Sequence, residues 1–249
     1  MTSPRTGTPL PVDGVLLDAD DTLYDTRSAM HSAGAAAAAA VWPGADPERV
    51  RGAGVRFRDD PEGHFHAYAR GEVEFDVMRR SRVADLARWL GQPVHDGLWG
   101  AFEATYEPAF LDAMRAFDDV RPCVAALRRA GLVVGVLTNS SATYTDRKMA
   151  AAGLGGLFDV VCSRDTLGFG KPDPRAFHEA CRRLGTAPAR TLYVGDDLET
   201  DPLGASAAGM PSAWLVRADP PDATATRRAE ERGIPVLTSL TDVPALLVG

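Results

Sequence analysis

Four aspartates lie close together near the start of the sequence, in the stretch VLLDADDTLYD, and their carboxylates are the first groups that could do chemistry. They are Asp18, Asp20, Asp21 and Asp25, and they follow the apolar residues 15–17. Like charges this close repel each other, and burying even one carboxylate is costly without a partner. A divalent cation, a lysine from elsewhere in the chain, or solvent must therefore neutralise them.

Three later segments carry side chains of complementary chemistry, each after an apolar run. Thr138 and Asn139 end the segment VVGVLTN, and Lys171 lies in the segment GFGKPDP. Acidic side chains follow the run TLYVG in the segment GDDLETD. The acidic residues of that segment with a candidate role are Asp196, Asp197 and Asp201.

Together these groups suit the handling of a phosphoryl group. Mg²⁺ usually takes one or two carboxylates together with substrate phosphate and water. The ammonium of Lys171 and the hydroxyl of Thr138 can hold phosphoryl oxygens. Asp18 could then be a nucleophile, and Asp20 a general acid and base.

Strand-like runs alternate with helical patterns after residue 115, and this order indicates how the groups come together. The predicted strands are residues 13–18, 133–138, 159–163, 191–195, 213–216 and, more weakly, 235–237. Such alternation indicates βαβ units and a parallel sheet, so we predict an α/β fold. Ligands bind beyond the carboxyl ends of strands in open parallel sheets, which is where the chemical groups lie.

Residues 26–114 have a different character, because helical patterns dominate there and strand-like runs are few. The block separates the first strand from the others and is too long for an ordinary crossover. We therefore predict an α/β core formed by residues 1–24 and 115–249, with an inserted α-helical domain of residues 25–114.

The motifs DADDT, LTN, GKPDP and GDDLETD, in this order, resemble the four motifs of the haloacid dehalogenase-like (HAD) hydrolase superfamily. Within it, the chain is similar to the phosphatases that carry a helical cap inserted after the first core strand. The resemblance implies a Rossmann-like core and a Mg²⁺-dependent phosphatase that works through an aspartyl-phosphate intermediate.

The resemblance also implies the catalytic roles. Asp18 would attack phosphorus and become the aspartyl-phosphate. Asp20 would protonate the leaving alkoxide and then activate the water that cleaves the intermediate. Thr138, Asn139 and Lys171 would bind the phosphoryl group.

A metal site is implied in the same way. Mg²⁺ would lie on the Asp18 carboxylate, the Asp20 backbone carbonyl and the Asp196 carboxylate. Asp201 would support this metal site or Lys171. Asp197 is a candidate for the same supporting role, with an exposed position as the alternative. Asp201 precedes a proline, as Asp173 does, and both pairs predict a helix start with an aspartate N-cap.

The composition of the chain limits the kinds of binding partner that we expect. The net charge is −7 and no long basic run occurs, so a nucleic acid polymer is not an expected partner. The N-terminus lacks a signal-like apolar region, and no run of about 18 apolar residues exists, so no membrane association is expected. The three cysteines are widely spaced, which fits buried thiols in a reducing cytoplasm. The choice between monomer and homodimer stays open.

Several alternatives use part of the same set. GFGKP is not a P-loop, because Asp165 and Pro172 replace the required glycine and hydroxyl residue. A phosphoryl-accepting signalling receiver fits within about 120 residues, whereas Asp18 and Asp196 lie much further apart. Dehalogenases of the superfamily lack an acid at the position of Asp20, which speaks against dehalogenation. A phosphomutase on the same fold remains an alternative.

The substrate is expected to be a small phosphorylated metabolite, either a sugar phosphate or a nucleoside monophosphate. The four motifs handle only the phosphoryl group and the metal, which every phosphate ester shares. Discrimination among esters is therefore expected from the inserted domain.

Overall fold

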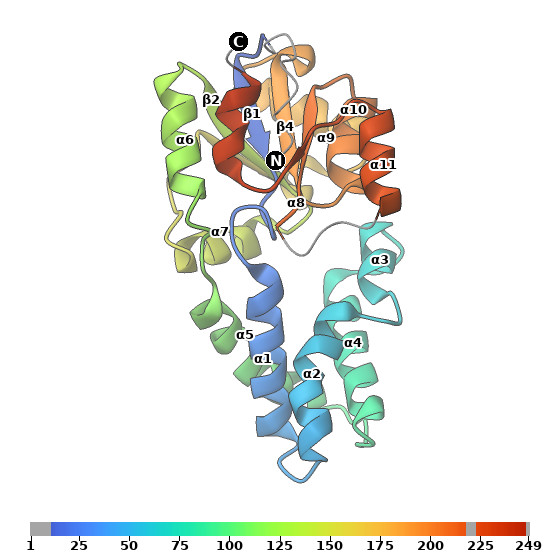
Figure 1. Cartoon of the computed structure of the whole chain (residues 1–249). Coiled ribbons are helices and arrows are strands. Elements are labelled where there is room, and N and C mark those ends of the chain that lie inside the picture. The colour runs from blue at the N-terminus through green and yellow to red at the C-terminus, as the bar shows by residue number, and fades with distance from the viewer. Residues whose placement is uncertain (1–10, 218–222, 248–249) are drawn as a thin grey trace. The chain divides into compact units, whose positions relative to one another are not determined.

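The computed structural model describes residues 11–217 and 223–247, which divide into two compact units (Figure 1). The α/β unit contains the chain up to Tyr24 and from Ala116 onward, and the helical unit is Asp25–Arg115. No helix in the described part of the chain is long and apolar enough to cross a membrane.

A six-stranded parallel sheet forms the centre of the α/β unit, with the strand order β3-β2-β1-β4-β5-β6. The strands are β1 (Gly14–Leu17), β2 (Val133–Thr138), β3 (Val160–Ser163), β4 (Thr191–Gly195), β5 (Ser212–Leu215) and β6 (Val236–Leu237). The order reverses direction at β1, and such a switch point is where open parallel sheets bind ligands. The predicted α/β class with a Rossmann-like parallel sheet is confirmed.

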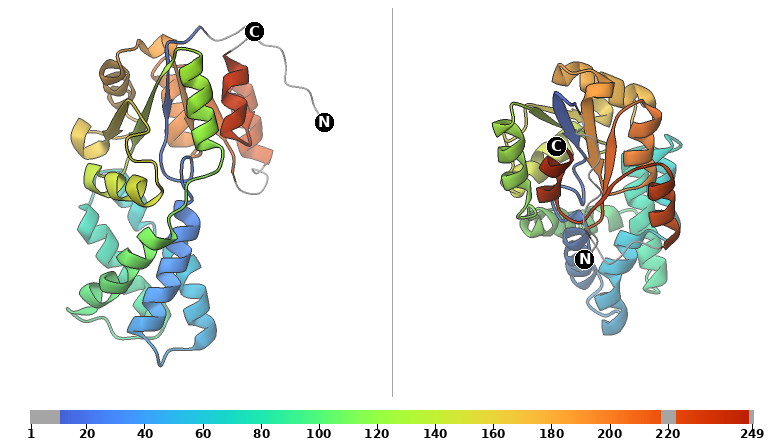
Figure 2. Two further views of the ribbon diagram at one scale, coloured as in Figure 1. Left: turned by 90° about the vertical axis from the view of Figure 1, so that its left-hand side faces the viewer. Right: turned by 45° about the horizontal axis from the view of Figure 1, so that its top comes forward.

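Helices cover both faces of this sheet. Helix α9 (Pro174–Leu184) packs on one face through Phe177, in a core cluster with Leu16 and Leu137. Helix α6 (Val120–Arg129) covers the opposite face (Figure 2). The other described segments of the unit are α7 (Ala142–Ala151), α8 (Arg164–Leu167), α10 (Gly204–Ala207), α11 (Ala223–Glu231), η1 (Pro188–Arg190), η2 (Glu199–Leu203) and η3 (Leu240–Leu246).

Strand β1 is apolar throughout because it lies in the middle of the sheet. All four of its residues are buried, including Val15, Leu16 and Leu17. A central parallel strand is covered on both faces, so its sequence is a continuous apolar run instead of an alternating one. The run ends where the chain reaches the edge of the sheet, and Asp18 is the first residue beyond it.

The helical unit contains α1 (Thr26–Val41), α2 (Pro47–Asp59), α3 (His64–Ala69), α4 (Phe75–Trp89) and α5 (Leu98–Ala113). Helix α1 contains a polyalanine stretch, residues 35–40, and it packs against α2 and α5. It begins at the N-cap Asp25, whose side chain accepts a hydrogen bond from the Ser28 amide at 2.8 Å.

The two segments that connect the units pair with each other. Tyr24 and Ala116 form an antiparallel bridge, and the Phe117 amide donates to the Leu23 carbonyl at 3.0 Å. The Asp25 amide donates to the carbonyl of Arg115 at the same distance. The chain therefore leaves the α/β unit a few residues after Asp20, and it returns at Ala116, next to the point where it left.

Candidate active site

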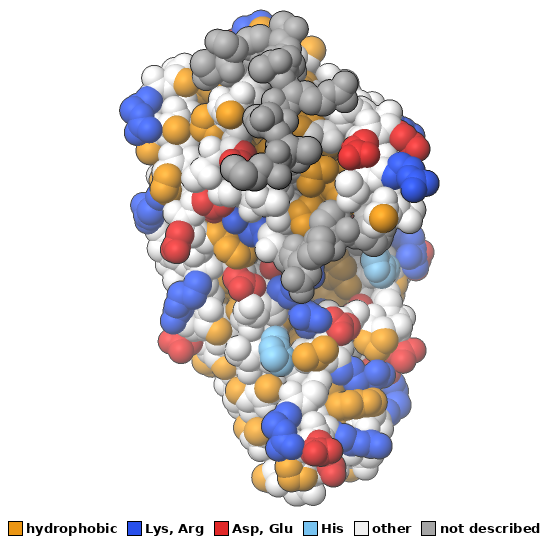
Figure 3. Space-filling model, viewed as in Figure 1, with side chains coloured by type: hydrophobic (Ala, Val, Ile, Leu, Met, Phe, Trp, Pro, Cys, Tyr) orange, Lys and Arg blue, Asp and Glu red, His pale blue; other side chains and the backbone are white. Residues whose placement is uncertain are grey.

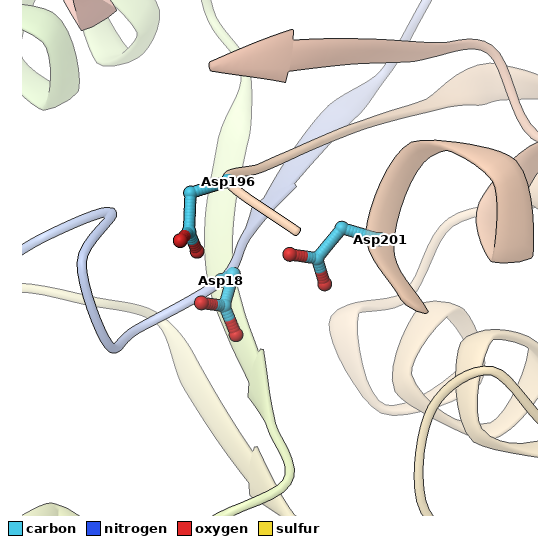
Figure 4. Close-up of side chains that lie close together, drawn as sticks. All are labelled: Asp18, Asp196 and Asp201. Atoms are coloured by element: carbon cyan, nitrogen blue, oxygen red, sulfur yellow. The ribbon is translucent and has the colours of Figure 1, made fainter. Parts of the chain in front are cut away.

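Three carboxylates meet at the carboxyl ends of the central strands (Figure 4). Asp18 follows β1, Asp196 follows β4, and Asp201 lies in η2. One oxygen atom from each lies within 4.8 Å of the others. The topology brings them together because β1 and β4 are neighbours at the switch point of the sheet.

The ammonium of Lys171 lies among these carboxylates. Its Nζ contacts an Asp18 oxygen, donates to Asp201 Oδ1 at 2.6 Å and lies 2.9 Å from the Tyr193 hydroxyl. Burial alone would lower the pKa of Lys171, but Asp18 and Asp201 outweigh it and hold that pKa well above its usual value. Lys171 is therefore a fixed positive charge at the end of β1.

The negative charges exceed what Lys171 neutralises. Burial raises the pKa of Asp18 to about 7, against the opposing effect of Lys171. Burial, followed by the charges of Asp18 and Asp201, holds the pKa of Asp196 well above its usual range. No cationic side chain of the described residues forms an ion pair with Asp196, whose carboxylate accepts a 3.4 Å hydrogen bond from Thr22. The site therefore has a deficit of positive charge.

This deficit fits a divalent cation. Carboxylate oxygens are ligands that Mg²⁺ prefers, and its charge would offset the repulsion between Asp18 and Asp196. Both oxygens of Asp201 already accept hydrogen bonds, from Lys171 and Tyr193 on one side and from the Asp197 amide at 3.1 Å on the other. Asp18 and Asp196 are therefore the carboxylates best placed to hold a metal ion.

Two glycines allow the close approaches in the site. A Cβ atom at Gly195 would lie 2.4 Å from the Asp201 carboxylate, so no larger residue fits at the end of β4. A Cβ atom at Gly170 would lie 2.5 Å from Asn139 Oδ1. That oxygen accepts from the Lys171 amide at 2.7 Å, while the Asn139 side-chain amide donates to the Lys171 carbonyl at 2.9 Å. The Asn139 side chain thus fixes the Lys171 loop, and its predicted phosphate contact would fall to its backbone.

Thr138 ends β2 with its side chain 2 % exposed, and its hydroxyl accepts from the Ser140 amide at 3.1 Å. Further groups hold the backbone around the carboxylates. The Trp214 indole donates to the Asp196 carbonyl at 2.8 Å, and Arg217 donates to the Thr22 carbonyl at 2.7 Å. The strand ends are therefore held in place from several sides.

Asp20 has a partner that the sequence analysis did not identify. Both of its carboxylate oxygens lie 2.6 Å from Nζ of Lys148, which comes from α7. Tyr193 was also missed, although its hydroxyl contacts both Lys171 and Asp201. A compositional signal for Lys148 was available: of the 27 cationic side chains of the chain, only Lys148 and Lys171 are lysines.

One local prediction for this region is wrong. Asp201 is not the N-cap of a helix that begins at Pro202, because the π-helical segment η2 begins at Glu199 and runs through both residues. Its carboxylate bonds Lys171 instead of the first amides of a helix. The predicted cap at Asp173 is confirmed, since its side chain accepts from the Arg175 amide at 2.9 Å.

Asp197 lies apart from the carboxylate cluster and is exposed. Its side chain accepts from the amides of Glu199 and Thr200, at 3.1 and 2.9 Å. It therefore shapes the turn into η2, and its backbone amide, through the bond to Asp201, is its link to the site.

The fold is of the α/β class. Its parallel sheet brings a buried aspartate, a lysine and further carboxylates together at the switch point, and these groups form the candidate active site. The sequence model of the haloacid dehalogenase-like hydrolase family matches residues 12–209, and the chain belongs to this family of hydrolases. The predicted family is thereby confirmed.

Several relatives are phosphatases. A glyceraldehyde 3-phosphate phosphatase of Methanopyrus kandleri is 29 % identical over 80 % of this chain and 82 % of its own. A phosphoglycolate phosphatase of Nitrosospira multiformis is 31 % identical over 81 % of this chain and 82 % of its own. A ribulose-1,5-bisphosphate 5-phosphatase of Halopiger xanaduensis is 29 % identical over 92 % of this chain and 98 % of its own.

Solved structures share the fold. YfnB of Bacillus subtilis, in a magnesium-bound crystal, matches with a TM-score of 0.72 and 19 % identity over 95 % of this chain and 98 % of its own. An L-2-haloacid dehalogenase of Xanthobacter autotrophicus matches with a TM-score of 0.68 and 23 % identity over 94 % of this chain and 98 % of its own. At these identities the likeness concerns the fold alone.

Proposed function

We propose that the chain is a Mg²⁺-dependent phosphatase that hydrolyses a small phosphorylated metabolite through an aspartyl-phosphate on Asp18. One observation carries the proposal: the buried Asp18 carboxylate ends the central strand, between the ammonium of Lys171 and a second carboxylate, Asp196, without a cation of its own. A nucleophile for a phosphate dianion needs this kind of site, because attack otherwise brings two anions together.

In the first step a carboxylate oxygen of Asp18 attacks phosphorus while the bond to the leaving oxygen breaks. A bound Mg²⁺, held by Asp18 and Asp196 and the Asp20 backbone carbonyl, would supply positive charge to the phosphoryl oxygens. Protonated Asp20 gives its proton to the leaving alkoxide, so that the alcohol departs neutral. Lys171 offsets the repulsion by its charge, and Thr138 donates a hydroxyl hydrogen bond.

In the second step Asp20 acts as a carboxylate. It takes a proton from a water molecule, and the resulting hydroxide attacks phosphorus and displaces the Asp18 carboxylate. Inorganic phosphate leaves, and Asp18 and Asp20 return to their starting states. The uncatalysed hydrolysis of phosphate monoesters is so slow that rate enhancements approach ~10²¹, which explains the concentration of charged groups in one place.

The names of the relatives support the sugar-phosphate side of the predicted substrate class. The phosphatases of glyceraldehyde 3-phosphate, phosphoglycolate and ribulose-1,5-bisphosphate all act on short phosphorylated carbon chains. We therefore rank sugar and carboxylate phosphates of two to five carbons above nucleoside monophosphates.

The test is phosphate release from a panel of such esters and from p-nitrophenyl phosphate, with and without Mg²⁺. We expect inorganic phosphate from p-nitrophenyl phosphate and a preference within the sugar-phosphate group. Conversion of a sugar phosphate to its isomer without phosphate release would favour the phosphomutase. Halide release from a 2-haloacid, with no phosphate release from any ester, would contradict the proposal.

We also propose that the helical unit selects the substrate. The α/β unit offers groups for the phosphoryl moiety, which all candidate substrates share. The helical unit begins at Asp25, five residues after Asp20, and the segments that connect it to the α/β unit pair with each other. A unit connected this close to the acid–base residue is well placed to discriminate between leaving groups.

Exchange of residues 28–110 for the corresponding block of a relative with another preference tests this second proposal. The hybrid should keep phosphate release from p-nitrophenyl phosphate and take on the donor's order of preference among esters. A folded hybrid with the original order would show that selection lies in the α/β unit.

A further inference from the structure

Lysine is rare in this chain, and both lysines serve the carboxylates of the site. The sequence has 27 cationic side chains, of which two are lysines and the rest arginines. The side chains of Lys148 and Lys171 are each 3 % exposed. The cationic side chains exposed on the face in Figure 3 are therefore arginines. The proposed mechanism uses Lys171 but gives no role to Lys148.

Lys148 forms an ion pair with Asp20 from the buried side of that carboxylate. Its Nζ lies 2.6 Å from both carboxylate oxygens, and the two residues are 128 positions apart in the sequence. The Asp20 side chain is 32 % exposed, whereas that of Lys148 is almost completely buried. The ammonium thus forms the fixed side of the pair, and the carboxylate is the side that can be reached from solvent.

The position of Lys148 is set by a well-anchored helix. Helix α7 starts just after Thr138 and Asn139, with Ser141 as its N-cap. Its first amide, that of Ala142, also donates to the Asp165 carboxylate at 2.9 and 3.1 Å. The same helix therefore links the end of β2 to the orientation of Asp20.

Aromatic rings complete the surroundings of the ammonium. Nζ of Lys148 lies 5.5 Å from the ring centroids of Tyr24 and Tyr144. Tyr24 is itself fully buried, and burial together with the charges of Asp20 and Asp18 holds its pKa well above its usual value. Rings at this distance favour a cation and confine the side chain that carries it.

Packing alone does not require an ammonium at position 148. An apolar side chain of the same length would avoid the desolvation of an ammonium, and such replacements are often neutral or stabilising. The pair is therefore better explained by what it does to Asp20 than by packing. A carboxylate held through both oxygens by a fixed ammonium loses most of its freedom to rotate away.

We propose that Lys148 is a positioning residue that holds Asp20 in line with the leaving oxygen of the substrate. The inference rests on the proposed function, in which Asp20 gives a proton to the leaving alkoxide as the P–O bond breaks. Lys148 exchanges no proton in this step. It fixes the carboxyl group whose proton passes to the alkoxide and whose carboxylate later accepts a proton from water.

The sharpest readout is the dependence on the leaving group. The value of kcat/KM reports the steps up to transfer of the phosphoryl group to Asp18, and p-nitrophenolate departs without a proton. Lys148→Met should therefore lower kcat/KM for an alkyl phosphate by about 10²-fold, at the low end of what general acid catalysis contributes. For p-nitrophenyl phosphate the same variant should stay within about threefold of wild type in kcat/KM, because its leaving group needs no acid.

The second step gives an independent signature with p-nitrophenyl phosphate. A misplaced Asp20 activates water poorly, so the phosphoenzyme should accumulate and p-nitrophenol should appear in a burst. Lys148→Arg, which keeps two donors for the carboxylate, should recover a large part of the alkyl phosphate activity. Arg147→Met, on the exposed side of the same helix, is the matched control and should behave as wild type.

A double-mutant cycle separates positioning from direct contact with substrate. If Lys148 acts through Asp20, Lys148→Met should cause no further loss in an Asp20→Asn background. An equal loss of kcat/KM for alkyl and aryl phosphates would overturn the inference. So would alkyl phosphate turnover by Lys148→Met at or above the wild-type rate, since the pair would then only restrain Asp20.

A readout without turnover distinguishes failure of this inference from failure of the proposed function. With [¹⁵N]lysine the protein should give two side-chain ammonium signals, of which Lys148→Met removes one. Asp20→Asn should shift that signal in the otherwise intact protein. If wild type releases no phosphate from any ester but Asp20→Asn still shifts the Lys148 signal, the proposed function fails while the Lys148–Asp20 ion pair is confirmed. If Asp20→Asn leaves the Lys148 signal unchanged, the pair does not exist in solution and the inference fails.

Discussion

Buried charges are used in opposite ways in the two units. The site of the α/β unit has four carboxylates and two ammonium groups: Asp18, Asp20, Asp196, Asp201, Lys148 and Lys171. The helical unit buries two arginines, Arg79 and Arg82, with side chains 8 % exposed. In the α/β unit the buried carboxylates lie together and outnumber the ammonium groups. In the helical unit each buried arginine has partners of its own.

Each of the two arginines faces one carboxylate, Glu103 for Arg79 and Asp60 for Arg82, together with aromatic rings. The Arg82 guanidinium lies 4.4 Å from the Phe57 ring centroid and donates to the carbonyl of the same residue. Arg79 pairs with Glu103 at 3.0 Å and lies 5.1 Å from the Tyr106 ring centroid. Planar guanidinium groups can stack and donate at once, which suits a role in packing.

The difference teaches how to tell a site from a core ion pair. A buried charge that is fully met by neighbours contributes to packing, and its removal should affect stability. A group of buried charges that leaves a net imbalance requires something that the chain does not supply. The following variants test this distinction.

Asp18→Asn should have the largest effect. An amide has nearly the shape of the carboxylate but is a poor nucleophile, so kcat for an alkyl phosphate should fall by at least about 10⁴-fold. The circular dichroism spectrum should be that of wild type. Near wild-type turnover of an unactivated ester would exclude covalent catalysis by Asp18.

Removal of the metal and Asp196→Asn should both abolish activity, but only Asp196→Asn should relieve the repulsion between the carboxylates of the metal-free site. Chelation should cost about 10³-fold or more in kcat/KM, the equivalent of several kcal/mol, and Mg²⁺ should restore the activity. Asp196→Asn should also abolish activity, but it should raise Tm of the metal-free protein at pH 8, because it removes a buried like charge. A rise of about 3 °C would correspond to roughly 1 kcal/mol in a chain of this size.

The pH dependence follows from the raised pKa values. In the metal-free protein the pKa of Asp18 rises from 3.8 to about 7, and that of Asp196 rises in the same direction. A raised folded-state pKa gives stability that is complete below the unfolded-state value and is lost as the pH rises through the folded-state value. The free energy of unfolding, measured in urea with chelator present, should therefore fall as the pH rises from 4 through about 7. A flat profile in this range would contradict the charge deficit.

Lys171→Met and Arg82→Met form a matched pair, one in each unit. Lys171→Met should lower kcat/KM for p-nitrophenyl phosphate by about 10³-fold, since it removes a preorganised charge next to the nucleophile. Arg82→Met should change kcat/KM by less than about threefold and act mainly on Tm, because the arginine serves packing. Similar losses of activity in both variants would remove the distinction between the units.

Asp119 offers the smallest effect and the strictest control, because it is a paired, half-buried charge inside the α/β unit. It accepts hydrogen bonds from Arg217 at 2.8 Å and from the Leu240 amide at 2.8 Å. Burial alone would raise the pKa of Asp119, but these bonds and that of Ser239 outweigh it and lower the pKa below 3.8. Asp119→Asn should cost about 1–3 kcal/mol at pH 7.

The sign of the pH effect is opposite to that of the site. A lowered pKa gives stability that is present above the unfolded-state value and is lost as the pH falls through the folded-state value. The difference in unfolding free energy between wild type and Asp119→Asn should thus be constant above pH 5 and shrink below about pH 4. A difference that grows toward acid pH would contradict the assignment.

The fold could be predicted from sequence because its signals are local. The bounds of β2 agree with the predicted residues 133–138, and β5 differs by one residue, since it is Ser212–Leu215 instead of 213–216. Apolar runs that end in polar groups fix both the strand and the edge at which its last residue lies. The meeting of Asp18, Lys171 and Asp196 follows from the strand order.

The remaining features depend on contacts between distant residues. Asp201 has the local sequence of an N-cap, but Lys171, thirty positions away, binds its carboxylate and overrides that preference. Lys148 lies within a helix, where a lysine is ordinarily a solvated residue, and only the packing of α7 brings it to Asp20. The domain boundaries and the catalytic roles remain predictions until variants are measured.

Because both lysines are buried, the rate at which their amines are acylated reports how often they become exposed to solvent. Acylating reagents attack the neutral amine, and neither ammonium is at the surface of the α/β unit. Acylation of Lys148 or Lys171 therefore requires a fluctuation that exposes the site, and its rate measures how often such fluctuations occur. A phosphate analogue bound at the carboxylates should slow both reactions, and peptide mass mapping would follow the acylation of each lysine separately in one sample.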